Sequence, residues 1–302
     1  MASRKRPAGN RSGLLYGLAG MGVLAILFFA ARPPAPPVKR APKLPAPHHA
    51  SAPVAIPKPA VAPPPVVAPV PPAPAPFPRG SGKIAIVLDD WGYTMKQVPA
   101  LEAIHAPLTV SVLPGLPHSA EVAEKAAALG HEVILHMPME AVNPNEPREE
   151  GRTILTGMGR SEILKLLDRS LATVPGARGM NNHQGSKVTA DPKAMKVILA
   201  EAKRRRLYFL DSVTGKSVCA DVAREVKVPF AQRAVFLDNE ASGPYILEQL
   251  VELARAAAEK GQAVGIGHDR PVTLKCLLEA VPELEKAGYT LVPVSDLVEE
   301  QT

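Results

Sequence analysis

The stretch KIAIVLDDWG, residues 83–92, decides the fold class of this chain. Its first six residues form a short apolar run typical of a buried strand, and the run ends in two adjacent carboxylates. Three further apolar runs also end in a histidine or an aspartate: 132–135 before His136, 207–210 before Asp211, and 263–267 before His268. A fifth, less apolar run, 178–180, leads into Asn181-Asn182-His183. Because the C-terminal ends of barrel strands open on one face, this pattern predicts a metal site on a β/α barrel.

Helical patterns alternate with these runs over roughly 220 residues, enough for one barrel-sized domain. Helices are predicted at 98–104, 120–129, 162–173, 193–204, 245–260 and 273–287, and further strands at 108–113, 229–232 and 290–294. Strand and helix in repeated alternation, with strands that are apolar throughout, predict a parallel sheet covered by helices. The seven or eight strands favour a closed or nearly closed barrel over an open sheet. The polar segment 141–159 is expected to be a loop over the strand ends.

The first 81 residues differ in composition from the rest. They contain no Asp or Glu and ten of the 35 Lys and Arg residues, which leaves 25 basic against 29 acidic residues from Gly82 onward. The basic balance of the whole chain therefore belongs to this segment and is no argument for nucleic-acid binding. Residues 32–80 hold 19 of the 34 prolines. Since proline fixes φ and removes amide donors, an extended Pro/Ala-rich linker is expected at 32–81.

Residues 13–31 form a run of 19 residues without a charge, with cationic residues on both sides. As a helix this run is about 28 Å long, close to the ~30 Å hydrocarbon thickness of a bilayer. The alternative is a cleaved signal peptide, but its apolar region is usually only about 7 to 15 residues long. We therefore expect a signal anchor, with the basic residues 1–12 cytoplasmic and the folded domain, 82–302, exported to the periplasm or cell-envelope side.

Two cysteines, Cys219 and Cys276, lie in the predicted domain. One disulfide is open to them in an oxidising compartment, but spacing alone does not establish it. Neither has the close Cys or His neighbour of a zinc motif, so two buried free thiols are expected.

Asp89 and Asp90 directly follow the first apolar run. Two such carboxylates can divide labour, one binding a metal ion and the other acting as a general base, because a nearby cation offsets their repulsion. The alternative is an N-cap for a helix that begins near Thr94, which needs only one Asp. Trp91, next in the motif, is a candidate substrate contact.

Two further motifs carry histidines. His136 and Glu140 would share one side of a helical segment, but Pro138 disfavours a continuous helix there, so His136 is the better candidate ligand. His183 lies in a dense polar cluster whose amides can orient an imidazole or bind sugar hydroxyls, a hydrogen-bonded turn being the alternative. The candidate substrate contacts in this cluster are Asn181, Asn182 and Ser186.

His268 ends the last strong strand, after two glycines that let the backbone pack closely. Such a histidine at the rim of the site can act as a general acid, whereas the alternative is a loop histidine paired with Asp269. Asp211 and Asp238 are weaker candidates for contacts that support the site or the substrate.

The motifs LDDWG, HMPME, NNHQGS and IGH together resemble the divergent polysaccharide deacetylases, relatives of the carbohydrate esterases that remove N-acetyl groups from chitin-like and peptidoglycan sugars. The likeness covers nearly all of residues 83–298. It implies a distorted seven-stranded (β/α) barrel of the glycoside hydrolase/deacetylase type. In the better-studied deacetylases the first Asp of the pair is the base, the second binds a divalent metal with two His, and a late-strand His is the acid. By position these are Asp89, Asp90 and His268.

The sequence departs from the ordinary deacetylase motif at the metal ligands. That motif places two histidines four residues apart, and here Glu140 stands in the second place. Either Glu140 is a ligand, or His183 from the following strand fills the gap. We favour Asp90, His136 and His183, a set that leaves an open position for water and suits zinc.

Three functions are open at this point. The first is metal-assisted hydrolysis of N-acetyl groups on an envelope polysaccharide such as peptidoglycan, by a protein attached to the membrane through its N-terminal helix. The second is a catalytically silent glycan-binding or scaffold protein that retains the pocket. The third, phosphoester hydrolysis, usually needs a two-metal ligand set that this sequence does not complete.

Overall fold

The computed structural model describes residues 77–299. The predicted basic segment, the membrane anchor at 13–31 and most of the linker lie outside the described residues, as do residues 300–302. Within 77–299, no helix is long and apolar enough to cross a membrane. The described part begins shortly before the predicted domain boundary at Gly82, and Phe77 already belongs to its core.

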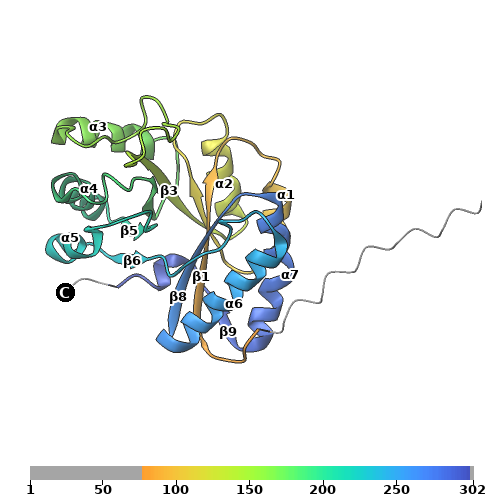
Figure 1. Cartoon of the computed structure of the whole chain (residues 1–302). Helices are drawn as coiled ribbons and strands as arrows, with labels where there is room; N and C mark the ends of the chain where they lie inside the picture. Colours follow the sequence, from red (N-terminus) through yellow and green to blue (C-terminus); the bar gives the residue numbers. More distant parts are fainter. Residues whose placement is uncertain (1–76, 300–302) are drawn as a thin grey trace, which may run out of the picture. The chain divides into compact units, whose positions relative to one another are not determined.

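The described residues form one nine-stranded sheet in the order β6-β5-β4-β3-β2-β1-β8-β7, with β9 beside β1 (Figure 1). All neighbouring strands are parallel. The strands are β1 (Gly82–Trp91), β2 (Thr109–Val112), β3 (Glu132–Met139), β4 (Gly179–Gln184), β5 (Tyr208–Asp211), β6 (Phe230–Gln232), β7 (Val235–Phe236), β8 (Gln262–His268) and β9 (Tyr289–Leu291). Parallel order brings the C-terminal ends of all of them to one face, as the sequence predicts.

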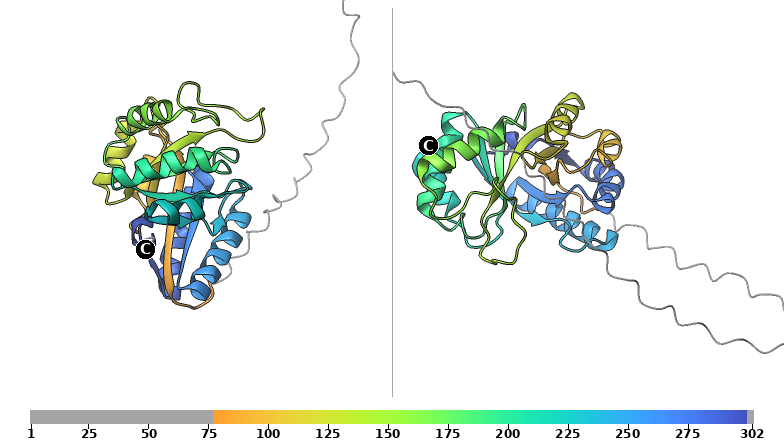
Figure 2. Two further views of the ribbon diagram at one scale, coloured as in Figure 1. Left: turned by 90° about the vertical axis from the view of Figure 1, so that its left-hand side faces the viewer. Right: turned by 90° about the horizontal axis from the view of Figure 1, so that it is seen from above.

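Helices connect the strands and lie outside the curved sheet (Figure 2, right). They are α1 (Val98–Glu102), α2 (Ser119–Ala128), α3 (Arg160–Leu171), α4 (Pro192–Arg204), α5 (Cys219–Val226), α6 (Gly243–Lys260) and α7 (Pro271–Ala287), and a 3-10 turn, η1, covers Val294–Asp296. The six predicted helices are confirmed, with ends that shift by one or two residues. The short α5 was not predicted.

Local sequence explains where several of these helices begin and end. At the start of α4, the Asp191 carboxylate accepts hydrogen bonds from the backbone amides of Lys193 and Ala194, and proline follows at the first helical position. At its other end, α6 stops at Gly261, which has φ 78°, a left-handed conformation that favours glycine. Gln262 follows at once as the first residue of β8.

The sheet curls but does not close into a complete barrel. Its edges are β6 and β7, which do not pair with each other although only Arg233 and Ala234 separate them in the chain. These strands have three and two residues, too few to form a ladder across the seam. Arg233 instead donates hydrogen bonds from Nε to the Ser212 carbonyl (2.7 Å) and from Nη2 to the Val213 carbonyl (2.8 Å). The expected barrel is therefore a curled parallel half-barrel, and the expected count of seven or eight strands was too low.

Side chains of β1 alternate between two cores. Ile84, Ile86 and Leu88 pack in the large core between the sheet and the helices, whereas Ala85 and Val87 pack in a smaller core inside the curl. Both cores are apolar at the level of these residues. The next residue of the inward-facing row after Ala85 and Val87 is Asp89, which lies near the C-terminal end of β1.

Cys219 and Cys276 are both buried free thiols, as expected from the sequence.

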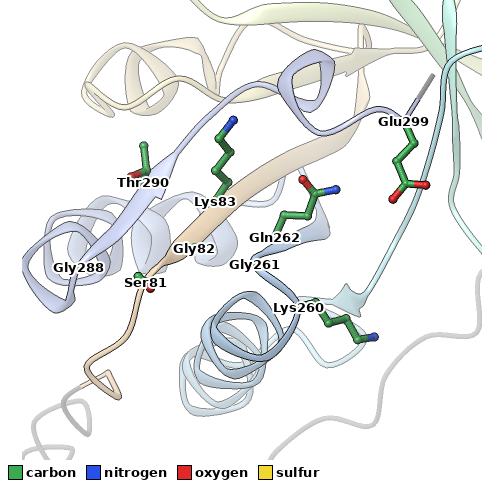
Figure 3. A pocket seen from close by; sticks show the side chains of 9 residues that line it. All are labelled: Ser81, Gly82, Lys83, Lys260, Gly261, Gln262, Gly288, Thr290 and Glu299. Atoms are coloured by element: carbon green, nitrogen blue, oxygen red, sulfur yellow. The ribbon is translucent and has the colours of Figure 1, made fainter.

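A cavity of about 620 Å³ lies at the opposite ends of the strands, where β1 and β8 begin (Figure 3). Its lining includes Lys83, Lys260 and Gln262, and it contains none of the predicted site residues. The chemistry of the sequence motifs therefore has to be sought at the other face.

Candidate metal centre

The end of β1 delivers two consecutive side chains to one site. Along a regular strand, Asp89 continues the inward row of Ala85 and Val87, and Asp90 would face outward. The pairing of β1 with β2 shifts register between Leu88 and Trp91, and Asp90 has φ 69°. A bulge of this kind re-aims a side chain, which brings the carboxylate of Asp90 beside that of Asp89.

Asp90, His136 and His183 form a compact cluster at the ends of β1, β3 and β4. The distances are 3.3 Å from Asp90 Oδ1 to His136 Nε2, 3.1 Å from Asp90 Oδ1 to His183 Nδ1, and 3.1 Å between the two imidazole nitrogens. Ligands of a tetrahedral zinc ion lie about 2.0–2.1 Å from the ion, hence about 3.3 Å from one another. Asp90 Oδ1 is buried and has no hydrogen-bond partner among the described residues. The three atoms therefore fit a divalent metal ion.

The charges of the cluster also favour a cation. Burial raises the pKa of Asp90, but the His136 and His183 imidazoles outweigh burial and hold that pKa well below its usual range. For His136 burial lowers the pKa, and the charges of Asp89 and Asp90 raise it above its ordinary value. Two carboxylates thus face two imidazoles in a largely buried space, where a positive charge is strongly stabilised.

Asn181 holds the cluster in place from the interior of the sheet. Its Nδ2 donates to Asp89 Oδ1 (2.9 Å), which fixes the amide orientation, and its Oδ1 then accepts from Ser111 Oγ (2.7 Å) and His136 Nδ1 (2.8 Å). Because Nδ1 of His136 donates, the lone pair of Nε2 faces Asp90 and is free to bind a metal. The sequence indicated Asn181 but not Ser111, which carries no motif and comes from β2.

His268 lies on the other side of the two aspartates. Its Nδ1 donates to Asp238 Oδ1 (2.8 Å), and its Nε2 lies 3.8 Å from Asp90 Oδ2. Asp238 is fully buried and its Oδ2 also accepts from the backbone amide of His268 and from Thr273 Oγ1. Burial lowers the pKa of His268, but the hydrogen bond to Asp238 and the charges of Asp90, Asp238 and Asp89 raise it above its usual value. The imidazole is therefore held with Nε2 toward the metal cluster.

Glu140, the alternative metal ligand, is bound elsewhere. Its Oε2 accepts from the backbone amide (2.8 Å) and hydroxyl (2.6 Å) of Thr156, and its Oε1 accepts from Lys187 Nζ (2.9 Å) and Arg148 Nη2 (3.3 Å). Burial raises the pKa of Glu140, but these donors outweigh it and lower the pKa to about 2. The carboxylate thus links the connection after β3 to the segment after β4. The third residue of the cluster is His183.

The other candidate substrate contacts are mostly buried. Trp91, Asn182 and Asp211 expose 2% of their surface or less. Asn182 Oδ1 accepts from the Ser212 amide (2.9 Å), and Asp211 accepts from the Val213 amide (2.8 Å) and Ser217 (2.6 Å). The contacts of Asn182 and Asp211 support the loop after β5. All three residues expose too little surface to contact a substrate. Partly exposed is Ser186, whose Oγ accepts from the backbone amide of Val142 (3.0 Å).

Comparisons with known proteins agree with this architecture. Residues 86–298 match the family described as divergent polysaccharide deacetylase. The chain is 37% identical over 224 residues to the uncharacterized protein YibQ of Escherichia coli (strain K12), which covers 73% of this chain and 68% of that protein. It is 33% identical over 211 residues to an uncharacterized protein of Haemophilus influenzae, covering 68% and 75%. The crystal structure of an uncharacterized protein from Agrobacterium tumefaciens C58 matches with a TM-score of 0.68 at 25% identity, over 73% of this chain and 90% of that one.

A curled parallel β/α sheet with its polar cluster at the strand ends defines the class as a deacetylase-like half-barrel. Within this class, the chain belongs to the divergent polysaccharide deacetylase family. The resemblance indicated by the four sequence motifs is confirmed.

Proposed function

We propose that this protein is a metal-dependent deacetylase that removes N-acetyl groups from a cell-envelope polysaccharide such as peptidoglycan. The observation that carries the proposal is the arrangement around Asp90 Oδ1, a buried carboxylate oxygen with two imidazole nitrogens at 3.1 and 3.3 Å. Family membership supports the polysaccharide substrate. Asp89 and His268 are paired neighbours at the ends of β1 and β8, next to this cluster, and have the side chains of a general base and a general acid.

Asp90, His136 and His183 would hold the ion, and zinc suits this donor set of one carboxylate and two imidazoles. When bound, a divalent ion supplies polarisation of the acetyl carbonyl and activation of a water molecule. Since the protein supplies three ligands, positions stay open for water and substrate.

Asp89 would accept the proton of the attacking water. Its Oδ1 accepts a hydrogen bond from Asn181 Nδ2, whereas its Oδ2 lies 3.6 Å from His136 Nε2 of the cluster. Protonated His268 then gives its Nε2 proton to the departing amine, while Asp238 keeps the ring oriented and stabilises its charge. The water's oxygen joins the acetyl carbon, the C–N bond breaks, and acetate and a free amine result.

Asp238 is expected to set the alkaline limit of activity. Because Asp238 raises the pKa of His268, Asp238→Asn should lower that pKa, so that the acidic form is lost at lower pH. The alkaline limb of the pH profile of kcat/KM for acetate release should then move to lower pH. Asn is nearly isosteric, and a thermal melt controls for folding. An alkaline limb that stays in place would assign that limb to another group.

The proposal is tested on the purified full chain by measuring metal content and acetate release from N-acetylglucosamine oligomers and peptidoglycan fragments. About one equivalent of metal together with acetate release is the expected result. A metal-loaded protein that binds these glycans without ever releasing acetate would be the silent binder considered above. One observation favours this second function. Glu140 stands where the ordinary deacetylase motif has its second histidine, and its carboxylate is bound by Lys187 and Thr156.

We further propose that residues 13–31 anchor the protein in the membrane with the catalytic domain on the exported side. The uncharged run of 19 residues supports this. Fractionation of cells that express the full chain should recover it with the membranes. Recovery of a processed chain lacking residues 1–31 from the soluble exported fraction would contradict the anchor.

A further inference from the structure

Tyr93 is an exposed aromatic side chain in the segment that follows Asp90 of the metal cluster at the end of β1. It lies three residues after Asp90 and exposes 54% of its surface. Two other large apolar side chains of the described residues are exposed, Val142 and Leu278. Val142 belongs to the connection between β3 and α3, which projects beyond the sheet in Figure 2 (left), and Leu278 lies on α7. Single exposed apolar side chains are common on protein surfaces, so the interest of Tyr93 lies in its position after Asp90 and in how its ring is held.

The ring is held by a chain of hydrogen bonds that joins three connections. Tyr93 Oη donates to Glu149 Oε1 (2.5 Å), and Glu149 Oε2 accepts from Arg152 Nη2 (2.6 Å). Arg152 Nη1 then donates to the Gly115 carbonyl (3.1 Å). These residues come from the segments after β1, β3 and β2, and we call the three side chains the Tyr93 clamp. The hydroxyl thus has a hydrogen-bond partner within the protein, and more than half of the surface of Tyr93 stays exposed.

The clamp lies within electrostatic range of the metal cluster. Burial raises the pKa of Tyr93 to about 12, with Glu149 and the charge of Asp90 adding to the rise, so the hydroxyl remains a donor. The pKa of Glu149 is raised by burial but held below its usual value by Tyr93, Arg152 and the charge of His183. Fields from two of the cluster residues therefore reach the clamp.

A ring fixed in this way is prepared for stacking. Tyrosine has few side-chain torsions, and the clamp restrains them before any ligand arrives, so binding loses little further conformational freedom. A pyranose ring presents an apolar face of C–H groups with hydroxyls at its edge. Such a face fits the exposed Tyr93 ring, and the charged clamp residues beside it can meet the hydroxyls.

We propose that Tyr93 is a sugar-stacking residue that selects glycan chains over small acetylated compounds at this site. The proposal rests on the deacetylase function proposed above for the reaction itself, but not for the binding. It assigns the subsite to the segment after β1, next to the metal ligand that the same segment supplies. The sugar bound there is adjacent to the one whose acetyl group reacts.

The kinetic test compares two substrates of the metal-loaded full chain, the N-acetylglucosamine tetramer and p-nitrophenyl acetate. Tyr93→Ala should raise KM for the tetramer about tenfold, the effect expected from loss of one aromatic contact. The ratio of kcat/KM for tetramer over ester should fall by a similar factor. Tyr93→Phe keeps the ring and should recover most of this ratio. Leu278→Ala removes an exposed apolar side chain in the middle of α7 and is the matched control.

A binding test separates failure of this proposal from failure of the proposed function. If the wild type releases no acetate, calorimetric titration with the same tetramer still applies, and Tyr93→Ala should weaken Kd about tenfold relative to Leu278→Ala. Equal loss of activity on tetramer and ester, or loss of metal in Tyr93→Ala, would show a structural role and overturn the proposal. So would a wild type that does not bind the tetramer.

Discussion

Replacement of His183 by alanine is expected to abolish stoichiometric zinc binding. His183 Nδ1 lies 3.1 Å from both Asp90 Oδ1 and His136 Nε2, so it completes the cluster. Without it, two protein ligands remain, fewer than the three that sites of this kind supply. Loss of a residue that merely supports a ligand weakens metal affinity about 10- to 100-fold, so loss of a ligand should exceed this range. Metal analysis after dialysis, followed by competition with a chelator, measures the effect.

Glu140→Gln is the matched control, because it removes the charge of the competing candidate. Glu140 makes its contacts with Thr156, Lys187 and Arg148. The variant should have a lower melting temperature, since a glutamine cannot accept all of these hydrogen bonds. Its zinc affinity should fall much less than that of His183→Ala. If Glu140→Gln loses zinc while His183→Ala keeps it, the third ligand is Glu140.

The sequence predicts the face on which the site lies because the Asp and His residues of the site directly follow apolar runs. Strands of a parallel half-barrel are buried on both sides, so they read as continuous apolar runs, and the first polar residue marks the strand end. This holds for His268, the last residue of β8. His136 follows its apolar run in the same way, although β3 continues to Met139. His183 is not the first polar residue of β4, and its place in the site follows from the register with β3, which sets it opposite Pro138, two pairs beyond the Asn181 and His136 pair.

Contacts between distant segments decide what the sequence could not. Whether Glu140 or His183 completes the cluster depends on Thr156 and Lys187, which reach the carboxylate from a loop and from the end of β4. Neither residue carries a motif, and both appear unremarkable in the chain. The bulge that turns Asp90 inward likewise depends on the register with β2.

Burial separates the remaining candidates in a way that residue type does not. Trp91 was predicted as a substrate contact and Asp211 as a contact that supports the site or the substrate, but both are buried. Tyr93, two positions further, was not selected by the sequence and carries the exposed ring. The half-barrel seam was missed for a similar reason, since the two residues of β7 are too few to show a pattern.

Asp89→Asn and His268→Ala are each expected to lower acetate release by about 10² or more, the usual size of a general base or acid contribution. In Asp89→Asn the new side chain can keep a contact with Asn181, but it no longer accepts a proton at the pH of the assay. In His268→Ala the donor facing Asp90 is gone, and Asp238 loses its imidazole partner. Single-turnover rates on the N-acetylglucosamine tetramer measure both effects without a contribution from product release.

Zinc content distinguishes these roles from metal binding. Both variants should keep about one equivalent of zinc, because the cluster of Asp90, His136 and His183 is intact in each. His118→Ala is the control for loss of an imidazole, since His118 is exposed and pairs only with Glu121. Loss of zinc in either variant would make that residue a ligand. Full activity in His268→Ala would mean that another donor, or water, protonates the leaving amine, and Asp238 would then have a purely structural role.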